Sequence, residues 1–170
     1  MTEQGRVLGL VVSSCGGVET RLCAELAEPA ARRGWRLAVT LTPAAARWLA
    51  TNGELERLWE LTDLEVRTTS RLPGESRPHP DPEVFLFAPA SAGSVAKLAL
   101  GVADNQAMTV LGDAVGEPSV TMVVGYQVRD SRFAHPAWQG HLDALASAGV
   151  RTERLRQDQP WTGILDHLPE

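Results

Sequence analysis

Residues 6–17 read RVLGLVVSSCGG, from Arg6 to Gly17. The run from Val7 to Val12 has no polar side chain, which is typical of a strand buried on both faces at the centre of a parallel sheet. Ser14-Cys15-Gly16-Gly17 interrupts the run, and a helix is expected from about Val18 to Arg33. Strand, turn and helix in this order form the repeating unit of a parallel α/β fold.

The same alternation continues along the chain. Further strands are expected at 35–41, 84–88, 120–124 and 150–155, with a short edge strand at 64–68. Helices are expected from Thr42-Pro43, over 94–102 and 106–115, and from His135-Pro136. Residues 70–82 contain four prolines and Gly74, so we expect a loop there. A second loop is expected at 125–133. We therefore predict one α/β domain over residues 1–170: a three-layer parallel sheet with helices on both faces, a core at about 6–155 and a polar tail or partner contact at 156–170.

Composition restricts the function. The chain has 170 residues, 44% hydrophobic and 22% charged, with a net charge of −5 and no basic patch. Nucleic acid and anionic membranes are therefore not expected partners. No apolar run is long enough to span a membrane, and Met1–Arg6 lacks the charge pattern of a secretory signal. Two cysteines, Cys15 and Cys23, do not form a disulfide scaffold, which favours a reducing cytoplasm.

The predicted strand ends carry small and hydroxyl-bearing residues. Ligands of such sheets bind beyond the carboxyl ends of the strands. Around Ser13, Ser14 and Gly16, backbone N–H groups at the start of a helix suit a phosphate; the alternative is a plain tight turn. The standard dinucleotide-binding and P-loop motifs do not occur. The four His and two Cys show no metal-ligand spacing, so no metal is predicted. Cys15 is either packed beneath the loop or, at a helix start, reactive.

A longer motif is more specific. Residues 88–105 read APASAGSVAKLALGVADN, and Pro89-Ala90-Ser91-Ala92 resembles the PASANT segment of the flavin-dependent cysteine decarboxylases. That family includes phosphopantothenoylcysteine decarboxylase and the peptidyl-cysteine decarboxylases of lanthipeptide biosynthesis. Residues 11–17, 41–45 and 135–137 are similar to further segments of the family, in the same order. The resemblance covers about residues 6–150.

The resemblance implies a Rossmann-like (flavodoxin-like) fold and bound FMN. It also implies a homo-oligomer, either a trimer or a trimer-based dodecamer, with FMN between subunits. By this resemblance Ser13, Ser14 and Gly16 contact the phosphate, and Thr42 donates to the phosphate or the ribityl chain. The residues expected along the flavin ring are Pro89, Ala90, Ser91 and Ala92. For Ser91, a helix N-cap is the alternative role.

The sequence departs from the family where the decarboxylases carry catalytic residues. Gly93 and Ser94 replace the Asn and Thr of PASANT. The family's upstream His aligns with Gly74-Glu75, and the nearest histidine is His79. We consider His79 either a solvated loop residue or an acid/base that reaches a neighbouring subunit's flavin.

The family's Pro-x-Met-Asn-x-x-Met-Trp segment is replaced here by residues 125–133, which contain neither Asn nor Met. Arg129 and Arg132 in this stretch are candidates for holding a carboxylate or phosphate, or they belong to a polar surface loop. The candidate catalytic residues are thus His79 and Arg129. We predict an FMN-binding flavoprotein that oxidatively decarboxylates a cysteinyl peptide or small thiol. The alternative is an FMN protein with another redox role or a non-catalytic subunit.

Overall fold

Strand β1, Val7–Val12, lies between β2, Arg36–Leu41, and β3, Val84–Ala90, and pairs in parallel with both. The computed structural model describes residues 5–170 and adds β4, Thr121–Tyr126, and β5, Arg151–Arg154, in the order β2-β1-β3-β4-β5. All pairs are parallel, which confirms the predicted fold class. Residues 1–4, part of the segment compared with a secretory signal, lie outside the described residues.

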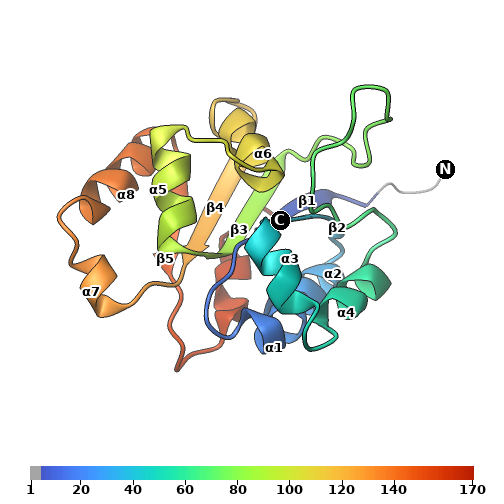
Figure 1. Ribbon diagram of the computed structural model, residues 1–170, viewed down its shortest axis with the longest axis horizontal. Coiled ribbons are helices and arrows are strands. Elements are labelled where there is room, and N and C mark those ends of the chain that lie inside the picture. The colour runs from blue at the N-terminus through green and yellow to red at the C-terminus, as the bar shows by residue number, and fades with distance from the viewer. Residues whose placement is uncertain (1–4) are drawn as a thin grey trace.

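Helices cover both faces of the sheet (Figure 1). One face is covered by α1 (Val18–Leu22), η1 (Cys23–Ala27), α2 (Glu28–Arg32), α3 (Pro43–Leu49), α4 (Glu54–Leu61) and the 3-10 helix η2 (Trp161–His167). The other is covered by α5 (Ala92–Leu100), α6 (Gln106–Val115) and α8 (Trp138–Ser147), with the short α7 (Asp130–Phe133) beside them. The sheet has a hydrophobic core on each face: the first core lies under α1 to α4 and η2, and the second lies under α5, α6 and α8. Side chains of β1 alternate between them, so Leu8 and Leu10 pack into the first core and Val11 packs into the second.

The first predicted helix forms as one segment, α1-η1-α2, with a π turn in its middle. Pro29 has no N–H to give the Glu25 carbonyl, and its ring would crowd that carbonyl in a regular α-helix. The backbone widens, so Glu28 N–H bonds Cys23 C=O and the Glu25 carbonyl instead accepts from the Thr162 hydroxyl at 2.8 Å. The N–H of Cys23 donates to buried Glu54 at 2.9 Å. The π turn thereby joins this helix to α4 and to η2.

Several expectations need correction. The expected edge strand at 64–68 is only an isolated bridge between Thr40 and Arg67. The loop expected at 125–133 contains the end of β4 and the helix α7, and α4 was not predicted at all. Strand β3 continues through Pro89 to Ala90, two residues beyond its expected end.

The expected tail at 156–170 is the largest error. Trp161, Ile164 and Leu165 are at most 2% exposed and pack into the first core. Ile164 and Leu155 lie so close to β4 that a side chain at Gly125 would overlap them. These apolar residues are spaced through a polar segment, and their partners in the first core lie far away in the sequence.

Candidate functional site

The carboxyl ends of β1 and β3 are joined by one side chain. Ser13, which is buried, donates its backbone N–H to the Pro89 carbonyl at 3.1 Å, and its hydroxyl lies 3.2 Å from the same carbonyl. The N–H of Ser91 donates to the Ser13 hydroxyl at 2.6 Å. Since β1 has β2 on one side and β3 on the other, the chain crosses over here, and ligands of open parallel sheets bind at this switch point.

The loop after β1 leaves several backbone donors free. The N–H groups of Ser14, Gly16 and Gly17 have no hydrogen-bond acceptor among residues 5–170. Gly17 has φ +91° and begins the helical segment at Val18, where a helix N-terminus concentrates partial positive charge. A side chain at Gly16 would come within 2.9 Å of the Gln157 amide nitrogen, so glycine keeps the loop narrow. The loop can accept an anion at its open N–H groups.

The end of β3 turns directly into α5. A cis peptide bond joins Ala88 to Pro89. The hydroxyl of Ser91 accepts the Ser94 N–H at 3.3 Å, which confirms the N-cap alternative for Ser91. The N–H groups of Ala92 and Gly93 lie in the first turn of α5, where no intrahelical acceptor is available. These N–H groups therefore lie near Ser13, which accepts the N–H of the preceding Ser91.

Thr42 places a second capped helix beside the same edge. Its N–H donates to the Val12 carbonyl at 3.0 Å, and its side chain accepts from Ala45 N–H at 3.2 Å as the N-cap of α3. Pro43 at the first helical position confirms the predicted start of this helix. The hydroxyl hydrogen of Thr42 is not used by this cap and is left to donate.

A cavity of about 600 Å³ lies beyond β4, and Gly16 and Arg129 both line it. Arg129 directly precedes α7. Asp130, the first residue of α7, forms an ion pair with Arg154 at 2.6 Å, and the Arg154 guanidinium holds the pKa of Asp130 below its usual range. The side-chain nitrogen of Gln127, another lining residue, is buried without a partner in residues 5–170. The structure thus brings Arg129 together with the β1 loop. Arg132 is exposed and does not line this cavity.

No protein-family model matches the chain, and no curated protein matches it by sequence. Solved structures do. The FMN-dependent cysteine decarboxylase TvaF from thioviridamide biosynthesis aligns with a TM-score of 0.76 and 23% identity, over 96% of this chain and 94% of TvaF. HAL3 from Cryptococcus neoformans aligns at 0.70 and 18% identity, over 95% and 93%. AnUbiX, solved with FMN and dimethylallyl pyrophosphate, aligns at 0.70 and 11% identity, over 88% and 77%.

This chain has the fold of the FMN-dependent cysteine decarboxylases. Within the cysteine decarboxylase fold, the predicted cofactor residues divide by position. Ser13, Thr42 and Pro89 to Ala90 are buried and tie the strand ends together, whereas Ser14, Gly16, Ser91 and Ala92 retain exposed surface. Whether they contact FMN stays a prediction. Sequence reasoning missed Gln127, because nothing in its neighbourhood marks a lone glutamine as unpartnered.

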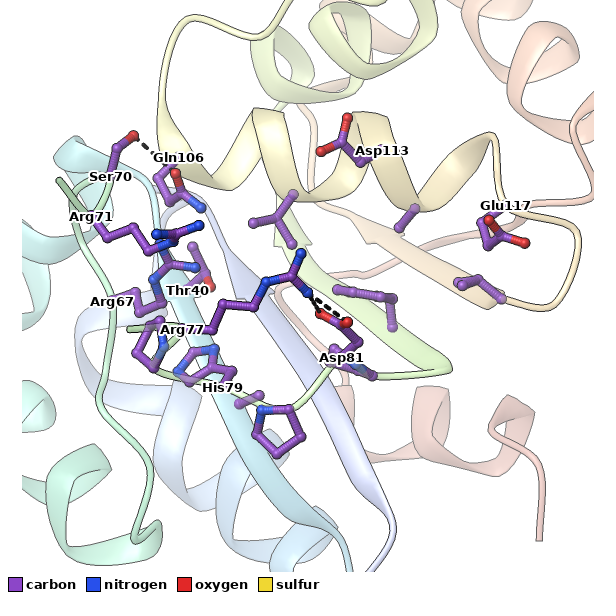
Figure 2. Close-up of a pocket in the computed structure, with 18 of the residues that line it drawn as sticks. Thr40, Arg67, Ser70, Arg71, Arg77, His79, Asp81, Gln106, Asp113 and Glu117 are labelled. Carbon is purple, nitrogen blue, oxygen red and sulfur yellow. Dashed lines mark hydrogen bonds and ion pairs between the residues drawn. The ribbon is translucent and has the colours of Figure 1, made fainter. Parts of the chain in front are cut away.

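The structure does not bring His79 to the cavity that holds Arg129. His79 lines a separate groove between α6 and the loop of residues 67–82 (Figure 2). Its Nε2 contacts the Glu65 carbonyl, and burial lowers the pKa of the imidazole. The ring is half-buried rather than freely solvated. Within one copy of the cysteine decarboxylase fold, the two candidate catalytic residues, His79 and Arg129, line different cavities.

Cys15 is packed beneath the β1 loop. Cys15 is 6% exposed, and burial raises the pKa of its thiol to about 12. This supports the packed alternative over the reactive one. Among the described residues, no cluster of three His, Cys, Asp or Glu side chains is arranged to hold a metal ion. No helix in residues 5–170 combines the length and apolarity needed to cross a bilayer.

Proposed function

We propose that this chain binds FMN, with the phosphate on the β1 loop and the flavin ring beside the Pro89–Ala92 turn. The observation that carries the proposal is the contact of Ser13 with Pro89 and Ser91, which sets the free N–H groups of the loop beside the start of α5. Helix starts and open N–H groups suit a phosphate dianion. The cysteine decarboxylase fold of TvaF, an FMN-dependent enzyme, supports the same assignment.

We further propose that the reaction is oxidative decarboxylation of a cysteinyl peptide or small thiol. FMN, when bound, supplies a two-electron sink for oxidation of the cysteine side chain, after which the substrate loses CO₂ and leaves an enethiol. Arg129 holds the substrate carboxylate, because it shares a cavity with Gly16 of the phosphate loop. The unpartnered Gln127 amide in that cavity offers a further donor.

We propose a homotrimer, or a dodecamer built from trimers, with the site shared between subunits. His79 and Arg129 lie in two different cavities of one copy, so an active site that uses both needs two copies. The two free cysteines, both buried, support a reducing, cytoplasmic location.

An FMN protein without decarboxylase activity is the second candidate. It is favoured by residues 125–133, which form the end of β4 and α7 and contain no Asn. In this alternative the phosphate loop is retained, while the substrate side serves a different redox step or a subunit contact.

Absorbance of the purified protein after FMN addition and desalting tests both candidates. We expect a retained, perturbed flavin band that Ser14→Asp abolishes, because the new carboxylate repels the phosphate. Thr121→Asp, at the exposed amino end of β4, is the matched control and should retain FMN. Cysteinyl peptides should then be decarboxylated, and Arg129→Gln should lower that activity at least tenfold with FMN still bound. Retained FMN without turnover supports the second candidate; no retained FMN overturns both.

A further inference from the structure

The groove that contains His79 has a basic end whose two arginines, Arg67 and Arg71, form no ion pair within residues 5–170. It holds about 920 Å³ between α6 and the loop of residues 67–82 (Figure 2). Thr40 of β2 and Phe85 of β3 line it from the sheet. Cavities of this size accept small organic ligands. Figure 2 shows Arg67 and Arg71 together at one end, beside Thr40 and Gln106.

Arg67 is held in place from both its backbone and its side chain. Its N–H donates to the Val39 carbonyl at 2.9 Å, and its carbonyl accepts from Leu41 N–H at 2.8 Å. The side-chain amide of Gln106 can hydrogen-bond both Arg67 and Ser70 in one orientation. Its oxygen then accepts from Nη1 and Nη2 of Arg67 at 3.1 Å, and its nitrogen donates to the Ser70 hydroxyl at 2.9 Å. The guanidinium is therefore positioned by a neutral group.

Neither arginine has an acidic partner among residues 5–170. Arg71 donates to the Glu75 carbonyl at 2.7 Å, and the ion pairs of the structure include neither Arg67 nor Arg71. Burial lowers the pKa of Arg67. The charge of Glu65, which forms no ion pair with Arg67, opposes this shift, and the charge of Arg71 adds to it. Two neighbouring guanidinium groups that form no ion pair repel each other, and an anion between them would reduce that cost.

The acidic residues of the groove are placed elsewhere. Asp81 is paired with Arg77 through both carboxylate oxygens, at 2.7 and 2.8 Å. Asp113 lies farther along α6 from Gln106, and Glu117 follows the end of that helix (Figure 2). At a rise of about 1.5 Å per residue, Asp113 is about 10 Å along the helix axis from Gln106.

We propose that Arg67 and Arg71 form a binding site for the oxyanion of an organic ligand, a carboxylate or a phosphate monoester, that lies along this groove. Guanidinium groups bind both oxyanions through paired N–H donors, and the Thr40 hydroxyl lines the same end as a further donor. The site is distinct from the phosphate loop at Ser14–Gly17 and does not depend on FMN binding there.

The experiment is a titration of the purified full chain at constant ionic strength, followed by amide NMR shifts or calorimetry. One arm uses inorganic phosphate, the other N-acetylglycine as a carboxylate probe. We expect saturable binding of at least one probe, weakened at least tenfold by Arg71→Gln and by Arg67→Gln. The matched control is Arg77→Gln, which removes the same charge from an arginine already paired with Asp81 and should change affinity less than threefold.

The two probes identify the class of oxyanion that binds. Saturable binding of phosphate, of N-acetylglycine or of both supports the proposal. Equal binding by Arg71→Gln and the unmodified protein, or no saturable binding, overturns it. Arg71 is exposed, so its variant tests the site even if Arg67→Gln fails to fold. A change in molecular mass of Arg71→Gln by light scattering would assign the arginines to a contact between copies, and also overturns the proposal. FMN retention, read separately by absorbance, should be unchanged by Arg71→Gln.

Discussion

The N–H of Ser91 donates to the hydroxyl of Ser13 at 2.6 Å, across the boundary between β3 and β1. One short side chain therefore fixes the distance between the loop after β1 and the start of α5. Both segments belong to the proposed FMN site, so the stability of the fold and the geometry of the site depend on the same hydrogen bond.

Ser13→Ala should destabilise the protein by about 1–3 kcal/mol, because the N–H of Ser91 loses its acceptor at a partly buried position. Urea denaturation followed by circular dichroism measures this. Ser14→Ala is the control, since Ser14 is half-buried and its hydroxyl makes no hydrogen bond to residues 5–170; its effect should stay within about 0.5 kcal/mol. Equal stability of the two variants would contradict the role given to Ser13.

Trp161→Ala should cost about 3–5 kcal/mol, because a large core side chain is removed from η2. Trp161 is 1% exposed, whereas Trp59 on α4 is 55% exposed. The same substitution at Trp59 should therefore change the free energy of unfolding by less than about 1 kcal/mol. Chemical denaturation measures the free energy of unfolding of both variants and of the unmodified protein. A small effect at Trp161 would restore the interpretation of residues 156–170 as a tail.

Acid should weaken the contact between the first helix and η2. The carboxylate of Glu25 accepts from Arg21 and from Trp161 N–H, each at 2.8 Å, and mainly the Arg21 hydrogen bond lowers its pKa below the ordinary 4.5. A lowered pKa in the folded state contributes stability above about pH 4.5, and this is lost as the pH falls through the folded value.

The urea midpoint measured from pH 7 to pH 3 should therefore fall less steeply for Glu25→Gln than for the unmodified protein. Glu60→Gln removes an exposed carboxylate of α4 and should follow the unmodified profile. Parallel curves for Glu25→Gln and the unmodified protein would show that this carboxylate does not contribute to the acid transition.

Both cysteines should be unreactive in the folded protein. Burial raises the pKa of Cys15 and of Cys23 to about 12, and the Glu54 carboxylate adds to the shift at Cys23. At pH 8 the thiolate fraction is then roughly a thousandfold smaller than for free cysteine. A thiol reagent such as dithionitrobenzoate should titrate two thiols in guanidinium chloride and react slowly without it. Rapid reaction of one native thiol would revive the reactive interpretation of Cys15.

The sheet and most helices were predictable because they depend on local signals. The uninterrupted run from Val7 to Val12 and the Thr42-Pro43 helix start are read from neighbouring residues, and both are confirmed. The N-cap role of Ser91 was likewise one of two predicted alternatives. Such features require no knowledge of distant contacts.

The errors occur where a distant partner decides the structure. The π turn needs Pro29 together with Thr162. Arg67 forms only a bridge, through Val39 and Leu41 of β2. The loop of residues 67–82 forms its groove with α6, so His79 and Arg129 line different cavities. None of these partners lies near in sequence, so no local pattern could reveal them.

The position of η2 has a consequence for biosynthesis. Trp161, Ile164 and Leu165 complete the core over the same face as Leu8 and Leu10 of the first strand. A nascent chain can cover part of that face with α1 to α4, but it cannot complete the core until these residues have left the ribosome. The apolar surface that η2 covers therefore stays open long after the first strand has been made, and this is the interval when a chaperone would be needed.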